Sequence, residues 1–323
     1  MALRRRERRV LLLGGTGFVG RRLAAALRGV GYDVRVPTRS RARGRRLFVL
    51  PEVEIVQADV HDEATLTRLL RGCEAAINLV GILNERGHDG AGFERAHAGL
   101  AATLMRACRA AGVNRVLQMS ALKADAERAP SHYLRTKGKA ERIVAEQSAG
   151  QIAYTIFRPS VIFGPDDSFT NRFAGLLRWM PVLPLPRAEA RFAPVFVDDV
   201  VAAFAAALTD ERSHSATYEL CGPDVYSLLE IVQYLRHVLG LKRAILPLPE
   251  GLGRFQAWIG EHLPGKPLSL DNFASLGVAS VCAGDASAAP FASPLRRLAD
   301  VVPTYLYPRG AQRLTRLRKS AGR

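Results

Sequence analysis

The first half of the chain alternates short apolar runs with segments in which apolar residues recur every three or four positions. The segments with the longer period predict helices at 18–28, 62–71, 93–111 and 131–147. The apolar runs, rich in Val, Ile and Leu, predict strands at 9–13, 33–37, 54–58, 75–80, 115–119 and 153–157. Because each parallel pairing of strands needs a crossover, this alternation predicts an α/β fold built on a doubly wound parallel sheet.

The pattern loosens after residue 160, and prolines cluster at 181, 184 and 186. We expect a strand at 191–197, a helix at 198–208 and an amphipathic helix starting near Ser227. The predicted domains are a sheet domain at 1–160, to which 191–222 returns, a smaller and mostly helical substrate-side lobe at 161–190 and 223–309, and a basic tail at 310–323.

A glycine motif directly follows the first predicted strand and opens the first helix. Gly14 suits a tight turn, Gly17 lets the backbone approach a pyrophosphate, and Gly20 allows the helix to pack closely on the strand. The pyrophosphate would lie at the helix N-terminus, where unpaired N–H groups and the helix dipole favour an anion. The motif therefore predicts a Rossmann dinucleotide-binding domain.

The end of the second strand decides which nicotinamide cofactor is expected. Chains that bind NAD carry a carboxylate about twenty residues after the glycine turn, whereas this chain has Arg39 followed by Ser40. A guanidinium can bind a 2′-phosphate bidentately, so we expect NADP(H) in preference to NAD(H). Asp59, at the end of the third strand, would either reach the adenine edge or cap its own loop.

The formal net charge of +16 raises the question of a nucleic-acid partner. The charge sits at the ends, because residues 1–46 carry +12 and residues 296–323 carry +7, which leaves −3 for the middle of the chain. Such ends suit docking on phosphates or on an anionic membrane surface, or they are solvated basic faces. No aromatic residues interleave with the arginines, so nucleic acid is the least favoured partner.

The four cysteines, at 73, 108, 221 and 282, lie far apart and form no CxxC pair. This spacing suggests neither a zinc site nor a disulfide framework, so we expect reduced thiols, no metal and a cytoplasmic location. No stretch reaches the roughly 18 apolar residues that span a bilayer, and the arginine-rich start lacks a signal-peptide cleavage site. Membrane attachment, if any, is expected to be peripheral, on the inner face.

Four further motifs follow the glycine turn: Asn78-Leu79-Val80-Gly81, Tyr133-Leu134-Arg135-Thr136-Lys137, Arg158-Pro159-Ser160-Val161-Ile162-Phe163-Gly164-Pro165 and Phe196-Val197-Asp198-Asp199-Val200. Together these motifs resemble the extended and atypical short-chain dehydrogenase/reductases of the NAD-dependent epimerase/dehydratase superfamily, over residues 10 to about 222. The segments 78–84, 132–137 and 158–165 are more narrowly similar to bacterial relatives of the nucleotide-binding accessory subunit of respiratory complex I.

The resemblance implies roles for three residues. Tyr133 would exchange a proton with the substrate, Lys137 would hold the nicotinamide ribose and lower the pKa of the phenol, and Ser120 would orient the carbonyl. Tyr133 and Lys137 are one helical turn apart, so the alternative to a catalytic pair is an ordinary pair of neighbouring side chains on the helix surface. Ala121 stands where relatives commonly carry a second hydroxyl, which puts full catalytic competence in doubt. His97 either faces the site through a water or is structural.

The expected cofactor site includes the glycine turn, the strand ends and the Tyr–Lys pair. Its residues are Gly14, Thr16, Gly17, Phe18, Val19, Gly20, Arg39, Ser40, Asp59, Val60, Leu79, Val80, Gly81, Tyr133, Lys137, Arg158 and Pro159. The substrate is less defined. The aromatic residues of the lobe, Phe169, Phe173, Trp179, Phe255, Trp258 and Phe273, suit either an apolar ligand or an ordinary core.

Two functions are compatible with these residues. The first is an NADP(H)-dependent oxidoreductase or epimerase that acts on a small, apolar or quinone-like substrate, linked to complex I or ubiquinone metabolism. The second is a non-catalytic subunit that holds NADPH as a structural element of a membrane-associated complex. A nucleotide-sensing regulator is a third alternative, and it rests on charge alone.

Overall fold

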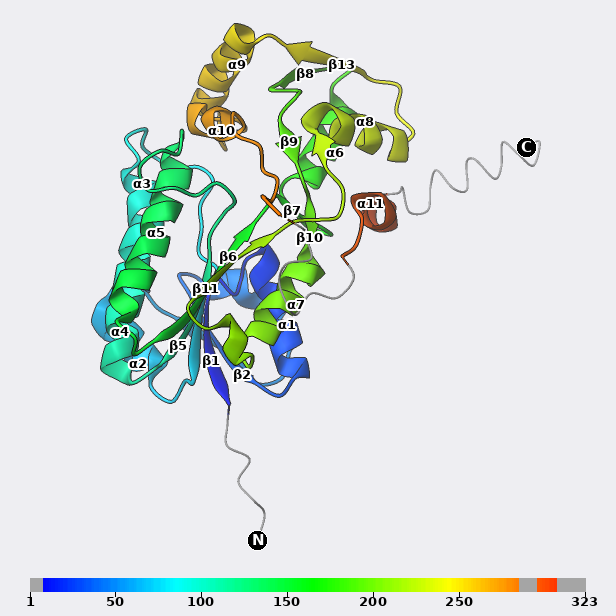
Figure 1. The fold of residues 1–323 in the computed structure, drawn as a ribbon. Coiled ribbons are helices and arrows are strands. Elements are labelled where there is room, and N and C mark those ends of the chain that lie inside the picture. Colours follow the sequence, from blue (N-terminus) through cyan, green and yellow to red (C-terminus); the bar gives the residue numbers. More distant parts are fainter. Residues whose placement is uncertain (1–7, 285–294, 307–323) are drawn as a thin grey trace, which may run out of the picture.

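The computed structural model describes residues 8–284 and 295–306, and its centre is a parallel sheet of seven strands (Figure 1). The strand order is β11-β6-β5-β4-β1-β2-β3, so the order reverses between β1 and β4. The strands are β1 Arg9–Leu13, β2 Asp33–Thr38, β3 Val53–Gln57, β4 Ala75–Asn78, β5 Arg115–Met119, β6 Ala153–Pro159 and β11 Ala216–Leu220. The predicted doubly wound Rossmann fold is confirmed.

Helices cover both faces of this sheet (Figure 1). The helices α1 and α7 pack together on one face, and α2, α4 and α5 pack on the other. The cap predicted for α2 is present, because the Asp62 carboxylate accepts the Thr65 N–H at 2.9 Å. The bounds are α1 Phe18–Gly29, the 3-10 helix η1 Arg41–Leu47, α2 Glu63–Leu70, α4 Leu100–Ala111, α5 His132–Ser148, α7 Val197–Ala207 and the 3-10 helix η3 Glu211–Ser213.

The helix predicted at 93–111 is not a single α-helix. It begins as α3, Ala91–Glu94, continues through a five-residue π-helix, η2, Arg95–Gly99, and then becomes α4. A π-turn inserts one residue without breaking the helix, so the period of the apolar residues changes too little to be seen in the sequence. His97 lies at the centre of the π-helix.

The lobe lies beyond the carboxyl ends of the sheet strands (Figure 1). Three two-stranded sheets join its parts: β7 with β10, β9 with β12 and β8 with β13. Its elements are β7 Ile162–Phe163, α6 Thr170–Trp179, β8 Val182–Pro186, β9 Arg191–Phe192, β10 Val195–Phe196, β12 Tyr226–Ser227, α8 Leu228–Val238, β13 Ala244–Leu248, α9 Glu250–His262, α10 Leu270–Ser275 and α11 Leu298–Leu306.

Two details of the lobe differ from the sequence pattern. The single strand predicted at 191–197 is wrong, because Pro194 has no N–H to continue a ladder and divides the run into β9 and β10. The two pieces pair with different partners, β9 with β12 and β10 with β7. The proline-rich segment is itself a strand, β8, which among the described residues pairs with β13 alone and can therefore accept prolines as an edge strand.

The core explains why β1 is apolar at every position from Val10 to Leu13. Val10 and Leu12 face the hydrophobic cluster that includes α1 and α7, whereas Leu11 and Leu13 face the cluster that includes α2 and α4. All four side chains are fully buried. A strand covered on both faces reads as a continuous apolar run, and it holds the glycine turn that follows it in a fixed position.

The expectation of four reduced thiols is wrong. Cys221, directly after β11, forms a disulfide with Cys282, 61 residues further along the chain. The segment after α10 reaches this place because the Ser280 carbonyl accepts hydrogen bonds from the Ala193 N–H at 3.0 Å and the Ser160 hydroxyl at 2.7 Å. No local motif joins the two cysteines, so spacing could not reveal the pair. Cys73 and Cys108 are free and buried. The predicted tail, 310–323, lies outside the described residues.

Candidate functional site

The glycine turn lies at the point where the strand order reverses, which is where open α/β sheets bind their ligands. Gly14 has φ +77°, and a Cβ there would lie 3.1 Å from the backbone of Leu79 at the end of β4. A Cβ on Gly20 would lie 2.3 Å from the Gly14 carbonyl oxygen. Both glycines are therefore required by close backbone approach, as the motif predicts.

The N-terminus of α1 is arranged for an anion. Within the described part of the chain no side chain caps the helix at Gly17, and its first turn holds no acidic residue. Thr16 is fixed by the Arg21 guanidinium, which donates to its carbonyl at 3.1 Å. Phe18 and Val19 pack against the core and anchor the first turn. The unpaired N–H groups of this helix end are free to bind a pyrophosphate.

The end of β2 carries unneutralised positive charge. Arg39 is exposed, and the adjacent Ser40 donates its N–H to the Thr38 hydroxyl at 3.3 Å. η1 adds the exposed Arg41 and Arg43. Among the described residues, none of these three arginines forms an ion pair with a carboxylate. The end of β2 and the start of η1 therefore form an exposed cationic surface.

Asp59 caps its own loop, and its contact with an adenine edge stays a prediction. Its carboxylate accepts the His61 N–H at 3.0 Å and so caps the loop that contains Val60. At the neighbouring end of β4, the Val80 N–H donates to the Asn78 side chain at 3.1 Å. A Cβ on Gly81 would lie 3.2 Å from the Lys137 amine, so the chain passes directly over that side chain.

Tyr133 and Lys137 lie in the first two turns of α5, which Ser131 caps through the Leu134 N–H at 3.2 Å. Lys137 is buried, with 2% of its surface exposed. Its amine donates to the carbonyls of Val80 at 3.3 Å and Met119 at 3.1 Å. These carbonyls end β4 and β5. The helix thus delivers the amine to the carboxyl edge of the sheet beside the switch point.

Burial moves both pKa values of this pair. It lowers the pKa of Lys137 to about 8, against a partial opposing effect of Glu141. It raises the pKa of Tyr133 to about 12, and the negative charge of Asp271 adds to the rise. Desolvation therefore dominates the pKa of Tyr133 in this arrangement, and the lowering of that pKa by Lys137 stays a prediction. At neutral pH the phenol is protonated and can act as an acid.

Ser120 has a buried hydroxyl without a partner. The residue directly follows β5 and is 3% exposed, its N–H donates to the Phe157 carbonyl at 2.7 Å, and its Oγ forms no hydrogen bond in the described structure. The next residue, Ala121, packs in a small apolar cluster with Tyr133 and Leu134. The position that commonly holds a second hydroxyl in relatives therefore forms part of the wall beside the tyrosine.

His97 is a structural part of the site wall. Its Nε2 accepts the Ile82 N–H at 3.2 Å and its Nδ1 lies 2.8 Å from the Thr136 hydroxyl. Its ring packs edge-on against Tyr133 with centroids 5.5 Å apart. Burial and the Lys137 charge lower the pKa of His97 to about 2, so the ring is neutral. Both nitrogens have protein partners, which leaves no free one for the predicted water.

Arg158 and Pro159 occupy the end of β6, beside α5. The Arg158 guanidinium donates to both oxygens of the Glu141 carboxylate, one of them at 2.8 Å, and this pairing raises the pKa of the guanidinium. The Pro159 carbonyl accepts the Leu122 N–H at 3.1 Å. These contacts hold α5 against the sheet one turn beyond Lys137, so the Arg158 side chain points to the helix.

The lobe contacts the start of α5 through residues that sequence reasoning missed. The Asp271 carboxylate of α10 accepts the N–H groups of His132 at 2.6 Å and Tyr133 at 3.2 Å. The Ser275 hydroxyl donates to the Ser131 hydroxyl at 2.8 Å. A signal for the start of α10 exists, because Ser269 and Asn272 form a capping box. Nothing in the local sequence pattern indicates that α10 contacts α5.

A cavity of about 250 Å³ lies at this junction. Its walls come from the loop after β4, the start of α5 and the α9–α10 region, and they include Asn84, Phe93, His132, Lys266 and Asp271. The Asn84 amide spans the junction by donating to the Lys266 carbonyl at 3.1 Å. The described residues contain no group of three His, Cys, Asp or Glu side chains that could hold a metal ion.

The glycine turn at the switch point and the helix that carries Tyr133 and Lys137 define a dinucleotide-binding protein of the short-chain dehydrogenase/reductase type. The comparison with protein families agrees, because the model of the NAD dependent epimerase/dehydratase family matches residues 10–221. The chain belongs to that family, and it is a nicotinamide-dinucleotide-binding protein of the same kind.

Two curated relatives of this chain have names that state different functions. The mitochondrial NADH dehydrogenase [ubiquinone] 1 alpha subcomplex subunit 9 of Arabidopsis thaliana is 33% identical over 231 residues, which cover 69% of this chain and 56% of that subunit. The ceramide reductase of Caulobacter vibrioides is 32% identical over 241 residues, which cover 75% of this chain and 74% of the reductase. The predicted similarity to the complex I accessory subunit is confirmed.

Solved structures share the fold at low identity. An NADPH-dependent quinone oxidoreductase from Escherichia coli, in complex with NADPH, has a TM-score of 0.72 at 20% identity, with 92% of this chain and 99% of that one covered. The UDP-glucuronic acid 4-epimerase from Bacillus cereus has a TM-score of 0.72 at 18% identity, with 92% of this chain and 98% of that one covered.

Among the helices within 8–284 and 295–306, none has the length and apolar character to cross a membrane.

Proposed function

We propose that this chain is an NADP(H)-dependent oxidoreductase that reduces the carbonyl group of a small apolar or quinone-like substrate. The observation that carries the proposal is the Ser120 hydroxyl, which is buried without a partner next to the Met119 carbonyl that Lys137 binds. A buried hydroxyl without a hydrogen bond is costly unless a ligand supplies one. A substrate carbonyl oxygen is a suitable acceptor for that hydroxyl.

The residues of the site divide the reaction between them. The glycine turn and Arg39 would hold NADPH, which when bound would supply the hydride for the carbonyl carbon. Tyr133 gives its phenolic proton to the oxygen, which becomes the product hydroxyl, while Ser120 donates a hydrogen bond to that oxygen. Lys137 is charged below its pKa of about 8 and lies on the same face of α5, so it stabilises the phenolate that remains. An epimerase would run this step in both directions at the same residues.

The proposed preference for NADP(H) rests on Arg39, Arg41 and Arg43. The side chains of these three arginines are exposed, and none forms an ion pair with a carboxylate within the described chain. An apolar substrate is supported by the ceramide reductase, whose name states a reduction of ceramide and of which the match covers 74%.

Deuterium transfer tests the proposed reaction. The purified protein is incubated with NADPH deuterated at the transferable position and a panel of apolar ketones that includes small, quinone-like and long-chain compounds, and products are analysed by mass spectrometry. We expect deuterium on the carbinol carbon of at least one product, and a faster reaction with NADPH than with NADH. Absence of deuterium from every product, with NADPH demonstrably bound, would contradict the reductase.

The second candidate is a non-catalytic subunit that holds NADPH within a membrane-associated complex. Ala121 favours it, because the site lacks the hydroxyl that relatives commonly carry there, and so does the similarity to the complex I subunit. Native mass spectrometry of protein purified from its own cells separates the two candidates. Retained nucleotide together with stoichiometric partner subunits supports the second, and a free monomer or homo-oligomer supports the first.

The same proposal includes the basic ends of the chain. They would attach the protein peripherally, either to the inner face of a membrane or to a complex at that membrane. Each basic residue near an anionic surface contributes about 1 kcal/mol. Deletion of residues 310–323 is expected to lower association with anionic liposomes at low salt and to leave nucleotide binding intact. Unchanged liposome association after this deletion would show that residues 310–323 do not attach the protein to the membrane.

A further inference from the structure

Helix α9 turns its apolar face to solvent. The side that packs on the lobe consists of the small residues Gly253, Ala257 and Gly260, which are buried. The large residues lie on the other side, where Phe255 is 57% and Trp258 is 51% exposed. Leu252, Ile259 and Leu263 extend this exposed stripe along the helix. An amphipathic helix of a globular domain normally has the opposite orientation.

The exposed stripe continues onto the neighbouring sheet. The Gln256 side chain donates to the Pro184 carbonyl of β8 at 3.3 Å, and Pro184 is the register partner of Leu246 on β13. Leu246 is exposed, and so is Val182, which lies on the same face of β8 as Pro184. Figure 1 shows α9, β8 and β13 at the end of the lobe farthest from the seven-stranded sheet.

Trp179 belongs to the same region. It ends α6, three residues before Val182, and is 85% exposed. We call the set formed by Trp179, Val182, Leu246, Leu252, Phe255, Trp258, Ile259 and Leu263 the lobe surface. The chain has two tryptophans, and both are part of it.

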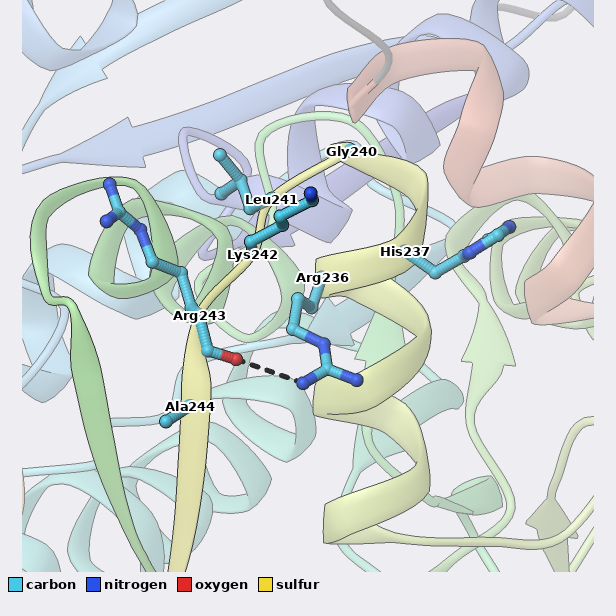
Figure 2. A pocket seen from close by; sticks show the side chains of 7 residues that line it. All are labelled: Arg236, His237, Gly240, Leu241, Lys242, Arg243 and Ala244. Atoms are coloured by element: carbon cyan, nitrogen blue, oxygen red, sulfur yellow. Dashed lines mark hydrogen bonds between the residues drawn. The ribbon is translucent and has the colours of Figure 1, made fainter.

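Positive charge borders the lobe surface. A groove of about 570 Å³ at the end of α8 is lined by Arg236, His237, Lys242 and Arg243 (Figure 2). Arg236 donates to the Arg243 carbonyl at 2.9 Å, and Arg243 donates to the Leu177 carbonyl at 3.2 Å. The second contact places the groove beside the last turn of α6, which carries Arg178 and Trp179.

These cations are held in place but not neutralised. In the described parts of the chain, none of Arg178, Arg236, Lys242 and Arg243 forms an ion pair with a carboxylate, and Arg254 on α9 is likewise unpaired and exposed. The hydrogen bonds of Arg236 and Arg243 go to neutral backbone carbonyl groups, which leave the full charge of both guanidinium groups available. The border of the lobe surface is therefore cationic.

We propose that the lobe surface docks onto an anionic lipid bilayer. Tryptophan and phenylalanine at the edge of leucine and isoleucine side chains suit the boundary between headgroups and acyl chains. The unpaired cations complement anionic headgroups, whereas a second copy of the chain would place the same cations opposite each other in a twofold interface. The charge thus favours a lipid surface over self-association. The docking is independent of hydride transfer and of the chain termini.

The tryptophans make the proposal directly measurable. Two full-length variants, Trp179→Phe and Trp258→Phe, each retain one tryptophan, and their fluorescence is recorded with vesicles of equimolar phosphatidylcholine and phosphatidylglycerol. We expect the emission of both variants to shift to shorter wavelength, and the shift to be lost with phosphatidylcholine alone. Vesicle binding without a shift of either tryptophan would place the contact elsewhere and overturn the proposal.

A matched pair of variants separates docking from folding. Phe255→Ser with Trp258→Ser removes two exposed side chains, and vesicle binding of this double variant is expected to fall on the order of tenfold or more. Phe48→Ser with Val49→Ser removes two exposed apolar side chains, 55% and 81% exposed, from the sheet domain and should leave binding unchanged. Equal loss in both double variants, or in neither, would contradict the assignment. NADPH affinity should be the same in all of them.

Discussion

Asp271 of α10 accepts a 2.6 Å hydrogen bond from the backbone N–H of His132, although 139 residues separate the two. His132 is the first residue of α5, the helix that carries Tyr133 and Lys137. The smaller lobe therefore supplies a cap for the helix that holds the proposed acid. Movement of the lobe would be transmitted to Tyr133, because the second oxygen of the same carboxylate accepts the Tyr133 N–H.

Removal of this cap should affect both stability and turnover. Asp271→Ala is expected to lower the free energy of unfolding by about 1–2 kcal/mol, since a charged cap at two N–H groups is lost. Asp271→Asn keeps an acceptor and should lose less. Asp62→Ala removes a cap at α2, remote from the site, and serves as control in urea unfolding and ketone reduction. If both alanine variants slow reduction equally, Asp271 has no special role.

The cofactor preference is expected to depend on Arg39. Arg39→Ala should weaken NADPH binding on the order of tenfold, because a charge-assisted contact to the 2′-phosphate is lost, and should leave NADH binding nearly unchanged. The dissociation constants are measured by fluorescence titration. Arg71→Ala, at another exposed arginine of the sheet domain, is the control. Equal affinities of the wild type for NADPH and NADH would refute the assignment.

Lys137 should make stability depend on pH. Its pKa is lowered from 10.5 to about 8 in the folded chain, so between these values the unfolded state binds more protons and stability rises with pH. We expect the difference in unfolding free energy between wild type and Lys137→Met to shift by about 2 kcal/mol in favour of the wild type from pH 8 to pH 10. Chemical denaturation at both pH values measures it. A constant difference would show that the amine keeps its ordinary pKa.

The disulfide predicts a count of thiols. Without reductant, denatured protein should show two reactive thiols, from Cys73 and Cys108, and with reductant four. Reduction should also lower the unfolding free energy by about 4 kcal/mol or less, given the long loop that the bond closes. Four thiols in protein denatured without reductant would contradict the Cys221–Cys282 bond.

The sequence is sufficient for the sheet and the glycine turn because both depend on local patterns. Each strand of the first half is an apolar run, and Gly14, Gly17 and Gly20 have spacings that only one kind of turn requires. The Tyr133–Lys137 pair is likewise visible, because helical spacing alone places both on one face. These features could be predicted from a single sequence.

The contacts between distant segments could not be predicted. The Cys221–Cys282 bond and the Asp271 cap join residues that the chain brings together only after the lobe has folded. The π-helix around His97 leaves the period of the apolar residues almost unchanged, so the pattern does not reveal it. The pairing of β9 with β12 and of β10 with β7 depends on partners from elsewhere in the fold. Exposure is equally invisible in the pattern, so Phe255 and Trp258 looked like core or ligand contacts and are on the surface.

Tyr133→Phe tests the central claim most directly. This variant keeps the ring that packs against His97 and removes only the proton that the reaction needs. The measurement is the rate of deuterium transfer from deuterated NADPH to a ketone that the wild type reduces, together with the dissociation constant for NADPH. We predict a rate at least a hundredfold lower, in the range of general acid catalysis of about 10²–10⁴-fold, with unchanged NADPH affinity. A rate equal to that of the wild type would contradict the proposed role of Tyr133.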